Sequence, residues 1–330
     1  MRVAQLGAGR IGAMHAAILA DLLEPGALVV ADVDAARAAS VAASTGATAA
    51  GIEGAIASAD ALFIAASSSA HPELIRAAIA RGVPTFCEKP LATDLDETRR
   101  LAEEIETSGI RFQLGFQRRF DAAYREARRL VEDGSLGTLY VVRLAGHDPE
   151  PPHEAYIPTS GGIFNDFSVH DFDVTRWLTG QEIEEVYADG DVLGFPMFAK
   201  YDDVDTAVAT LRLSGGTRAI LSVTRHDPLG YDIRTELFGS GDSVTIGLGP
   251  RTPMRSLEPG VPPPAGPAWP HFMDRFHDAY ENEVRAFLRV ARGEEESACT
   301  ARDGLEAARV AVAATRSLRE HRPVRVVEVT

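Results

Sequence analysis

The segment Val3-Ala4-Gln5-Leu6-Gly7-Ala8-Gly9-Arg10-Ile11-Gly12 decides the fold of this 330-residue chain. A short strand-like run leads directly into the pattern Gly-x-Gly-x-x-Gly, and a helical pattern follows over Met14–Leu23. In such a strand–turn–helix the glycines permit a tight turn and a close approach of a ligand, and the helix N-terminus offers N–H groups to a phosphate. The segment therefore predicts a dinucleotide-binding turn.

The rest of residues 1–118 alternates short apolar runs with helical patterns. The strand-like runs are Leu28–Val33, Ala61–Ala66, Thr85–Cys87 and Phe112–Phe116, and the helical patterns are Ala35–Ser44, Pro72–Arg81 and Leu95–Ser108. This alternation is typical of a parallel sheet with helices on both faces. Residues 1–118 are therefore predicted to form an α/β Rossmann domain that binds NAD or NADP.

The pattern changes from about residue 120. Strand-like runs at Thr138–Ala145, Val204–Leu213, Thr217–Thr224, Ile233–Phe238 and Val324–Val329 accompany helical patterns at Asp121–Asp133, Ile163–Leu178, Phe272–Arg292 and Ala301–Glu320. Successive strands separated by turn residues favour antiparallel pairing. We therefore expect an α+β domain over residues 119–330 with a largely antiparallel, open-faced sheet, whose C-terminal helix can pack back on the first domain.

The composition argues against several classes of protein. The chain has 33 basic and 48 acidic residues, a net charge of −15, whereas a nucleic-acid-binding protein needs a basic face. Cys87 and Cys299 cannot form a disulfide framework, and no Cys/His cluster has zinc-ligand spacing. No apolar stretch is long enough for a transmembrane helix, and no secretory leader is seen. We expect a cytoplasmic protein without a metal centre that binds neither nucleic acid nor membrane.

Asp32 is placed to select the cofactor. It ends the second strand-like run, 20 residues after Gly12. A carboxylate at this position accepts hydrogen bonds from the ribose hydroxyls of NAD and repels the 2′-phosphate of NADP. The sequence therefore favours NAD, while the nearby Arg37 keeps NADP as the alternative.

Lys89 stands out because the chain contains 31 arginines and only two lysines. It follows an apolar run in Cys87-Glu88-Lys89-Pro90, at the edge of the sheet where ligands bind, whereas Lys200 lies in a polar segment and is interpreted as a surface residue. A lysine is a compact donor with an adjustable pKa, which an arginine is not. Lys89 is therefore predicted to be catalytic, with a chance placement as the alternative.

A carboxylate and a histidine recur at helical spacing in the stretch Asn165–Asp173. Asp166 and His170 are four residues apart, and Asp173 follows His170 by three, which puts all three on one face of an α-helix. A histidine held by a carboxylate can act as a general base near neutral pH. A surface ion pair explains the same spacing, so the residues alone leave both interpretations open.

Together these motifs resemble, in order and in spacing, those of the glucose–fructose oxidoreductase / inositol dehydrogenase / MocA family. The family's glycine turn matches Gly7–Gly12, its Glu-Lys-Pro motif matches Glu88-Lys89-Pro90, and its Asp-x-x-x-His pair matches Asp166 and His170. The resemblance covers essentially the whole chain. It implies that the cofactor is bound by Gly7, Gly9, Arg10, Ile11, Gly12, Asp32, His71, Glu88 and Lys89; for His71 a buried structural role is the alternative.

Further stretches are similar to the inositol dehydrogenase branch of that family. Gly115–Asp121 looks like its GFxRRFD segment and Gly230–Ile233 like its GYDI segment. The resemblance implies substrate contacts from Arg118, His147, Asp166, His170 and Tyr231. The loop from His147 to Asp166 is longer than usual in the family, which makes the match of His147 less secure. The Gly161-Gly162 pair recurs in several sugar-acting branches, so other sugars stay open as substrates.

The resemblance implies an NAD-dependent dehydrogenase that oxidises a secondary hydroxyl of a cyclic polyol or sugar, with myo-inositol as the best single candidate. In this scheme His170 removes the hydroxyl proton, Asp166 orients His170, and Lys89 hydrogen-bonds the reacting oxygen. The resemblance also implies a homo-oligomer, a tetramer or a dimer, formed through the open face of the second sheet. The alternatives are a dehydrogenase of a pyranose or anhydrosugar, such as glucose or levoglucosan, and a catalytically inactive dinucleotide-binding sensor.

Overall fold

The computed structural model describes residues 1–329, which form two compact units. Unit 1 comprises Met1–Phe120 and Asp278–Glu306, and unit 2 comprises Asp121–His277 and the residues from Ala307 onward. Residues 278–306 thus belong to unit 1, although they lie in the range expected for the second domain. The domain boundary at residues 118 and 119, and the roles assigned to each domain, remain predictions. Within the described residues, no helix has the length and apolar character that a membrane span needs.

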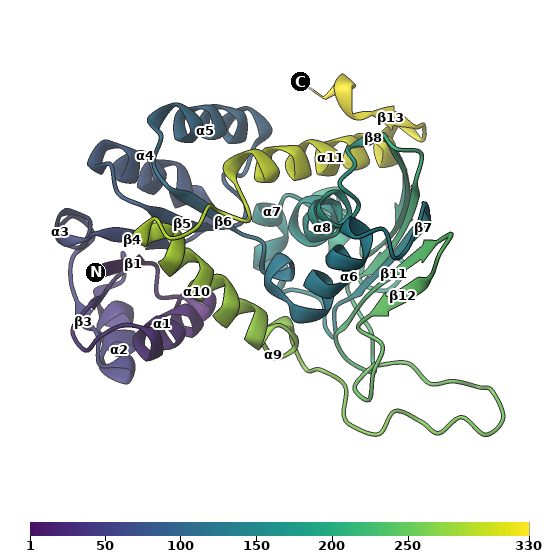
Figure 1. Ribbon diagram of the computed structural model, residues 1–330, viewed down its shortest axis with the longest axis horizontal. Helices are drawn as coiled ribbons and strands as arrows, with labels where there is room; N and C mark the ends of the chain where they lie inside the picture. The colour runs from purple at the N-terminus through teal and green to yellow at the C-terminus, as the bar shows by residue number, and fades with distance from the viewer. Residues whose placement is uncertain (330) are drawn as a thin grey trace. The chain divides into compact units, whose positions relative to one another are not determined.

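Unit 1 is built on a parallel sheet with the strand order β3-β2-β1-β4-β5-β6 (Figure 1). Its strands are β1 (Val3–Leu6), β2 (Leu28–Ala31), β3 (Thr48–Ala49), β4 (Ala61–Ile64), β5 (Thr85–Glu88) and β6 (Phe112–Gly115). All neighbouring pairs are parallel. The strand order reverses beside β1, and ligands bind at such a point, outside the carboxyl ends of the strands. The predicted Rossmann-type sheet is confirmed; β3 was not anticipated.

In the part of the chain that the structure describes, unit 1 contains six helices and two short 3-10 turns, and side chains cap the N-termini of two of these helices. They are α1 (Arg10–Leu22), α2 (Ala35–Thr45), α3 (Ile52–Ser58), α4 (His71–Arg81), α5 (Leu95–Ser108) and nearly all of α10 (His277–Arg292), with short 3-10 turns η1 (Ser68–Ala70) and η2 (Gln117–Phe120). The Asp34 carboxylate accepts hydrogen bonds from the first-turn N–H groups of α2, and Asp94 does the same for α5. Helix α3 was not predicted from the sequence.

Helix α10 packs on the sheet of unit 1 through aromatic rings. Phe63 of β4 and Phe86 of β5 stack with their ring centroids 4.1 Å apart. Phe287 of α10 meets both rings at 5.8 Å. Large rings that interlock in this way contribute more than their buried area alone. The contact explains why a helix so late in the chain belongs to the nucleotide-binding unit.

Unit 2 is built on a sheet with the order β12-β11-β7-β10-β9-β8-β13. Its strands are β7 (Leu139–His147), β8 (Ile183–Asp191), β9 (Thr206–Leu213), β10 (Arg218–Thr224), β11 (Asp232–Gly239), β12 (Ser243–Ile246) and β13 (Val324–Arg325). The pairing is antiparallel except between β7 and β10, which are parallel. The predicted sheet class is confirmed. The successive strands β10 and β11 do not pair with each other, because β7 lies between them.

Unit 2 also contains helical segments. They are α6 (Ala122–Glu132), η3 (Glu154–Tyr156), α7 (Ile157–Ser160), η4 (Phe164–Ser168), α8 (Val169–Thr179), η5 (Phe198–Tyr201), α9 (Phe272–Arg275), the later part of α11 (Ala301–Glu320) and η6 (Val326–Glu328). Of these, α6 and α8 lie beside the sheet of unit 2 (Figure 1). Strands β8 and β12 were not predicted. The predicted strand Val324–Val329 is wrong beyond Arg325, where η6 begins, and the predicted helix Phe272–Arg292 is interrupted at Phe276.

One face of the unit 2 sheet is buried and the other is open. In β9 the side chains of Ala207, Ala209 and Leu211 are buried, whereas Val208 and Thr210 are exposed. This alternation with a period of two is expected of an antiparallel strand covered on one side. The exposed large apolar residues of the unit include Tyr140, Tyr187, Val208 and Ile220.

Candidate active site

The glycine turn between β1 and α1 is closely packed on one side and open on the other. Gly7 has φ +106°, and a Cβ atom there would overlap the backbone of Ala65. A Cβ atom on Gly12 would overlap the carbonyl of Gly7, whereas one on Gly9 would meet nothing within 4 Å. The Gln5 side chain donates hydrogen bonds to the carbonyls of Gly7 (2.9 Å) and Gly12 (2.6 Å). The Gln5 side chain therefore stabilises the turn, and Gly9 faces open space.

These features fit the pyrophosphate of a dinucleotide. Helix α1 begins at Arg10, and no side chain caps its N-terminus. Its first N–H groups and the space at Gly9 can therefore receive an anion. Arg10 is exposed and Ile11 is half-buried at the start of this helix, which is where the sequence predicted cofactor contacts.

Asp32 follows β2 and braces the glycine turn. Its Oδ2 accepts a hydrogen bond from the Ala8 N–H (2.7 Å), and its Oδ1 accepts one from the Asp34 N–H (2.8 Å). A guanidinium nitrogen of Arg37 lies 3.8 Å from Oδ1. The carboxylate therefore links the ends of two neighbouring strands. Its predicted role toward the ribose remains a prediction.

His71 connects the segments that follow β4 and β5. It is buried at the start of α4, with Nδ1 2.7 Å from the Pro90 carbonyl oxygen and Nε2 3.2 Å from that of Ala66. Burial is the largest influence on this imidazole and lowers its pKa, against the opposing effect of the two carbonyls. With both nitrogens facing backbone, His71 has the contacts of a positioning residue. The geometry favours the structural alternative over the predicted contact with the cofactor.

Lys89 follows β5 at the same edge of the sheet as the glycine turn, because the strands of unit 1 are parallel. It is half-buried, and its backbone N–H donates to Glu88 Oε2 (3.2 Å). The other oxygen of Glu88, Oε1, lies 2.7 Å from Nε2 of His15. Glu88 is thus engaged with protein groups on both oxygens. This contact with His15 was not found from the sequence.

Asp166 of unit 2 is held by two residues that the sequence did not single out. The Tyr156 hydroxyl donates to its Oδ1 (2.8 Å), and Nη1 of Arg225 lies 3.0 Å from its Oδ2. Arg225 is only 3% exposed and also reaches Asp148 (3.4 Å). Burial opposes the charge of this guanidinium, but Asp166 and Asp148 raise its pKa overall. The pairing keeps a carboxylate and its cation together in a largely buried place.

His170 lies at the start of α8, directly after a π-helical turn. Residues Phe164–Ser168 form that turn, and it contains Asp166. A π turn bonds residue i to i+5, so Asp166 is displaced around the axis from the position that an uninterrupted α-helix gives. His170 is half-buried and Asp173 is buried. The predicted uninterrupted α-helix is therefore wrong at this point, and π turns are frequent at functional sites.

His147 ends β7 and is hydrogen-bonded by the neighbouring strand. Its Nδ1 lies 2.8 Å from Oγ1 of Thr224, whose hydroxyl donates to the His226 carbonyl (3.0 Å). Since that hydroxyl proton is already used, Nδ1–H of His147 is the donor and Nε2 is the acceptor. Burial lowers the pKa of this imidazole, despite the opposing charge of Asp232. A neutral His147 can accept a hydrogen bond from a hydroxyl group.

The remaining predicted substrate residues are more deeply buried. Tyr231 is 6% exposed, its N–H donates to the Trp269 carbonyl (2.8 Å), and its ring meets Phe272 and Phe276 edge-on. Arg118 is buried in η2 of unit 1. The structure therefore groups the predicted cofactor residues in unit 1. In unit 2 it connects Asp166 through Arg225 to Asp148, which follows His147.

Comparison with known proteins gives the family. Residues 1–116 match the model described as an oxidoreductase family with an NAD-binding Rossmann fold, and residues 124–245 match the GFO/IDH/MocA C-terminal domain. A myo-inositol dehydrogenase of Streptomyces leeuwenhoekii is 42% identical over 96% of this chain and 97% of its own length. The chain belongs to the Gfo/Idh/MocA family. As a member it is an NAD-binding oxidoreductase, so the prediction of an enzyme is confirmed.

Solved structures of the Gfo/Idh/MocA family superpose over nearly the whole chain. A probable dehydrogenase from Thermotoga maritima has a TM-score of 0.92 and 34% identity, with complete coverage of both chains. A scyllo-inositol dehydrogenase from Lactobacillus casei, solved with NAD(H) and scyllo-inositol, has a TM-score of 0.87 and 29% identity, with 99% of each chain covered. The predicted fold class is confirmed by these family structures.

Proposed function

We propose that this protein is an NAD-dependent dehydrogenase of a cyclic polyol, with myo-inositol as its substrate. The observation that carries the proposal is the Asp166 carboxylate, held by Tyr156 and Arg225 one turn before His170. A carboxylate fixed in this way can bind hydroxyl groups and orient an imidazole. The myo-inositol dehydrogenase of Streptomyces leeuwenhoekii supports the choice of polyol. The Lactobacillus casei enzyme makes scyllo-inositol the second candidate.

The residues of unit 1 fit NAD. The N-terminus of α1 and the open space at Gly9 would hold the pyrophosphate, and Asp32 would accept hydrogen bonds from the adenosine ribose. When bound, the nicotinamide supplies the carbon that accepts a hydride. The protein supplies position and electrostatic stabilisation.

We assign the proton transfer to His170, which takes the proton of the reacting hydroxyl as general base. Asp166 positions this imidazole and can accept a hydrogen bond from a neighbouring hydroxyl of the polyol. Arg225 offsets the negative charge of Asp166 from 3.0 Å, and its guanidinium lies over the ring of Phe167. His147 is proposed to accept a hydrogen bond from the polyol through Nε2. Tyr231 and Arg118 are proposed as further positions that shape substrate binding.

Lys89 is proposed to donate a hydrogen bond to the reacting oxygen. Negative charge develops on this oxygen as its proton leaves, and a preorganised ammonium stabilises that charge best in a site shielded from water. A guanidinium is larger and planar, so an arginine cannot occupy the same position with one donor aimed at one atom.

We also propose that the enzyme is a homotetramer that works in the cytoplasm. The open face of the unit 2 sheet carries Tyr140, Tyr187, Val208 and Ile220, and exposed apolar patches of this kind mark interaction surfaces. Ile220 lies opposite Thr210 of β9 and Arg143 of β7 in the sheet, so the face has an apolar centre with polar neighbours. Light scattering of wild type and of Ile220→Glu tests this: the substitution should reduce the mass of the particle.

A single spectrophotometric screen tests the function. Purified protein is given NAD or NADP together with myo-inositol, scyllo-inositol, glucose or levoglucosan, and formation of the reduced cofactor is followed by its absorbance. We expect turnover with NAD and myo-inositol to exceed that with every other pair in kcat/KM. A higher value with glucose or levoglucosan would replace the polyol by a sugar as the substrate.

A further inference from the structure

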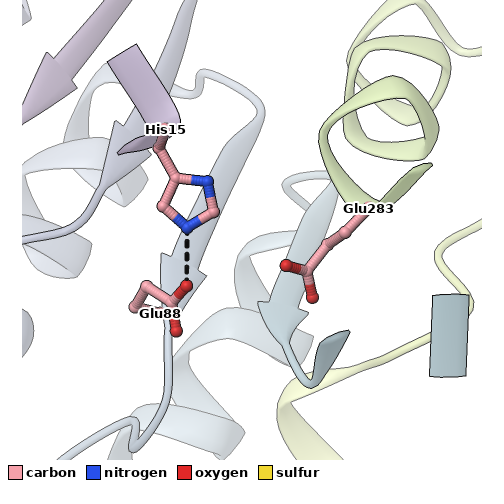
Figure 2. A group of neighbouring side chains, drawn as sticks. All are labelled: His15, Glu88 and Glu283. Carbon is pink, nitrogen blue, oxygen red and sulfur yellow. Dashed lines mark hydrogen bonds and ion pairs between the residues drawn. The ribbon is translucent and has the colours of Figure 1, made fainter. Parts of the chain in front are cut away.

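Three titratable side chains from distant parts of the sequence meet inside unit 1, and one of them, Glu88, directly precedes Lys89. They are His15 from α1, Glu88 from β5 and Glu283 from α10 (Figure 2). One nitrogen of His15 and one carboxylate oxygen of each glutamate lie within 4.8 Å of one another. His15 and Glu283 are 0% exposed. Figure 2 shows the Glu283 carboxyl group directed toward the imidazole and toward Glu88.

The surroundings of this cluster are apolar and aromatic. The His15 ring lies 4.8 Å from Phe63, 5.7 Å from Phe86 and 5.5 Å from Tyr280, measured between ring centroids. The helix that carries Glu283 is fixed here, because Gln113 of β6 donates to the backbone carbonyl of Glu283 (3.0 Å). A carboxylate enclosed in this way loses the hydration that stabilises its negative charge.

The surroundings of Glu283 disfavour the ionised form of its carboxyl group. Both of its carboxyl oxygens lie in the buried part of the structure without a hydrogen-bond partner. Burial first, and the negative charge of Glu88 second, raise the pKa of Glu283 well above its ordinary value. Burying an isolated ionised carboxylate costs far more than protonating it near neutral pH. The side chain therefore carries an O–H donor.

The hydrogen bonds of Glu88 and His15 indicate which acceptor is left for a donor on Glu283. Glu88 accepts the Lys89 N–H with Oε2 and contacts Nε2 of His15 with Oε1, so the carboxylate receives a proton donor at each oxygen. His15 then donates through Nε2, and in a neutral imidazole its Nδ1 becomes an acceptor. Nδ1 of His15 is also buried without a partner in the described structure. The cluster thus contains an unsatisfied carboxyl group on Glu283 and an unsatisfied acceptor on His15.

We propose that Glu283 is a positioning residue for the reaction, whose un-ionised carboxylic acid donates a hydrogen bond to His15 through one water molecule. The chain of donors then runs from Glu283 to His15, from His15 to Glu88, and ends where Glu88 accepts the backbone N–H of Lys89. Each link fixes the next one. The chain holds the segment that carries the proposed catalytic lysine, and the inference therefore rests on the proposed function.

A metal ion is the competing occupant of this cluster. Zinc holds nitrogen and oxygen ligands at roughly 2.0–2.2 Å, so two ligands of a tetrahedral site are about 3.4 Å apart. Here the separations extend to 4.8 Å, and the 2.7 Å contact between His15 and Glu88 already satisfies the ligand atoms of both. The geometry fits a hydrogen-bonded chain better than a coordination site.

Infrared and nuclear magnetic resonance spectra test the chain without reference to turnover. The difference spectrum between wild type and Glu283→Gln should contain the carbonyl band of an un-ionised carboxylic acid at neutral pH. Nitrogen-15 spectra of histidine should show His15 protonated at Nε2 and not at Nδ1. Absence of the carboxylic acid band, or a stoichiometric metal in the purified protein, would overturn the proposal. These readouts stay informative if the substrate proposed above is wrong.

Kinetics then test the positioning role. Glu283→Gln keeps a donor and should retain kcat within about twofold, whereas Glu283→Leu removes the donor and should lower kcat by about tenfold or more at similar KM. The control is Glu281→Gln on the same helix, where the exposed carboxylate pairs with Arg285 (2.6 Å). Equal kcat in the Gln and Leu variants would refute the chain. Should the Leu variant fail to fold, the Gln variant and the spectra decide the matter.

Discussion

The free energy of unfolding should fall with rising pH more steeply in wild type than in Glu283→Gln. Glu283 is fully buried and has a raised pKa in the folded protein. In the unfolded chain the same carboxyl group ionises near 4.5. A group whose folded pKa is raised contributes stability in full below its unfolded pKa. It loses that contribution as the pH rises through its folded pKa.

The size of the effect follows from one proton. Between the two pKa values the folded protein binds one more proton than the unfolded chain, which lowers stability by about 1.4 kcal/mol for each pH unit. A glutamine at this position has the same shape and no proton to bind. Wild type should therefore lose stability relative to Glu283→Gln by that amount per pH unit, or about 3–5 °C in unfolding midpoint.

The comparison isolates Glu283 because its titratable neighbours are the same in both proteins. The titratable groups of the cluster and its surroundings are His15, Glu88 and Tyr280. Thermal unfolding of wild type, Glu283→Gln and Glu281→Gln is measured from about pH 5 to about pH 8, the interval above the unfolded pKa. Glu281→Gln should follow wild type in parallel. A midpoint difference between wild type and Glu283→Gln that does not change with pH would refute a buried un-ionised carboxyl group.

Four further predictions concern the cofactor and substrate residues. Lys89→Arg should fold and bind NAD but lose most turnover. The control Lys200→Arg changes an exposed lysine paired with Glu154 and should leave turnover unchanged. Near-normal activity of Lys89→Arg would contradict the catalytic role of Lys89. His170→Ala should lower kcat by about 10²–10⁴-fold, and an unchanged pH–rate profile would show that another group is the base. Asp32→Ala should lower the affinity for NAD more than the affinity for NADP in binding titrations. An equal loss of both affinities would contradict the proposed contact of Asp32 with the ribose. Arg225→Met leaves Asp166 and Asp148 without their buried cation and should cost about 3–5 kcal/mol in denaturant unfolding; the exposed Arg218→Met is its control.

Much of unit 1 was predictable because its signals are local. The strands β1, β2, β4, β5 and β6 are short apolar runs between helical patterns, and the glycine turn follows β1 directly. The overlap of a Cβ atom at Gly7 and at Gly12 gives the physical reason for those glycines. The composition also pointed to Lys89, because two lysines among 33 basic residues are easy to notice.

Unit 2 was less predictable because pairing and helix type depend on distant contacts. The parallel pairing of β7 with β10 brings together segments separated by the whole of α8 and two strands. Residues Phe164–Ser168 form a π turn, and nothing in their sequence distinguishes it from an α-helix. Arg225 has no sequence feature that distinguishes it from the other arginines of the chain. Only the fold shows that it is buried against Asp166.

The sequence by itself determined the Rossmann-type sheet, because alternating strands and helices follow from local periodicity. The family followed from the resemblance of its motifs, which also marked the glycine turn, Lys89, Asp166 and His170 as candidates. Tertiary structure alone decided which of these residues have partners. His15, Glu88 and Glu283 are far apart in the chain, and nothing in their local sequence marks them as neighbours. The raised pKa of Glu283 follows from burial and from the charge of Glu88, which act on it only once β5 and α10 have packed together.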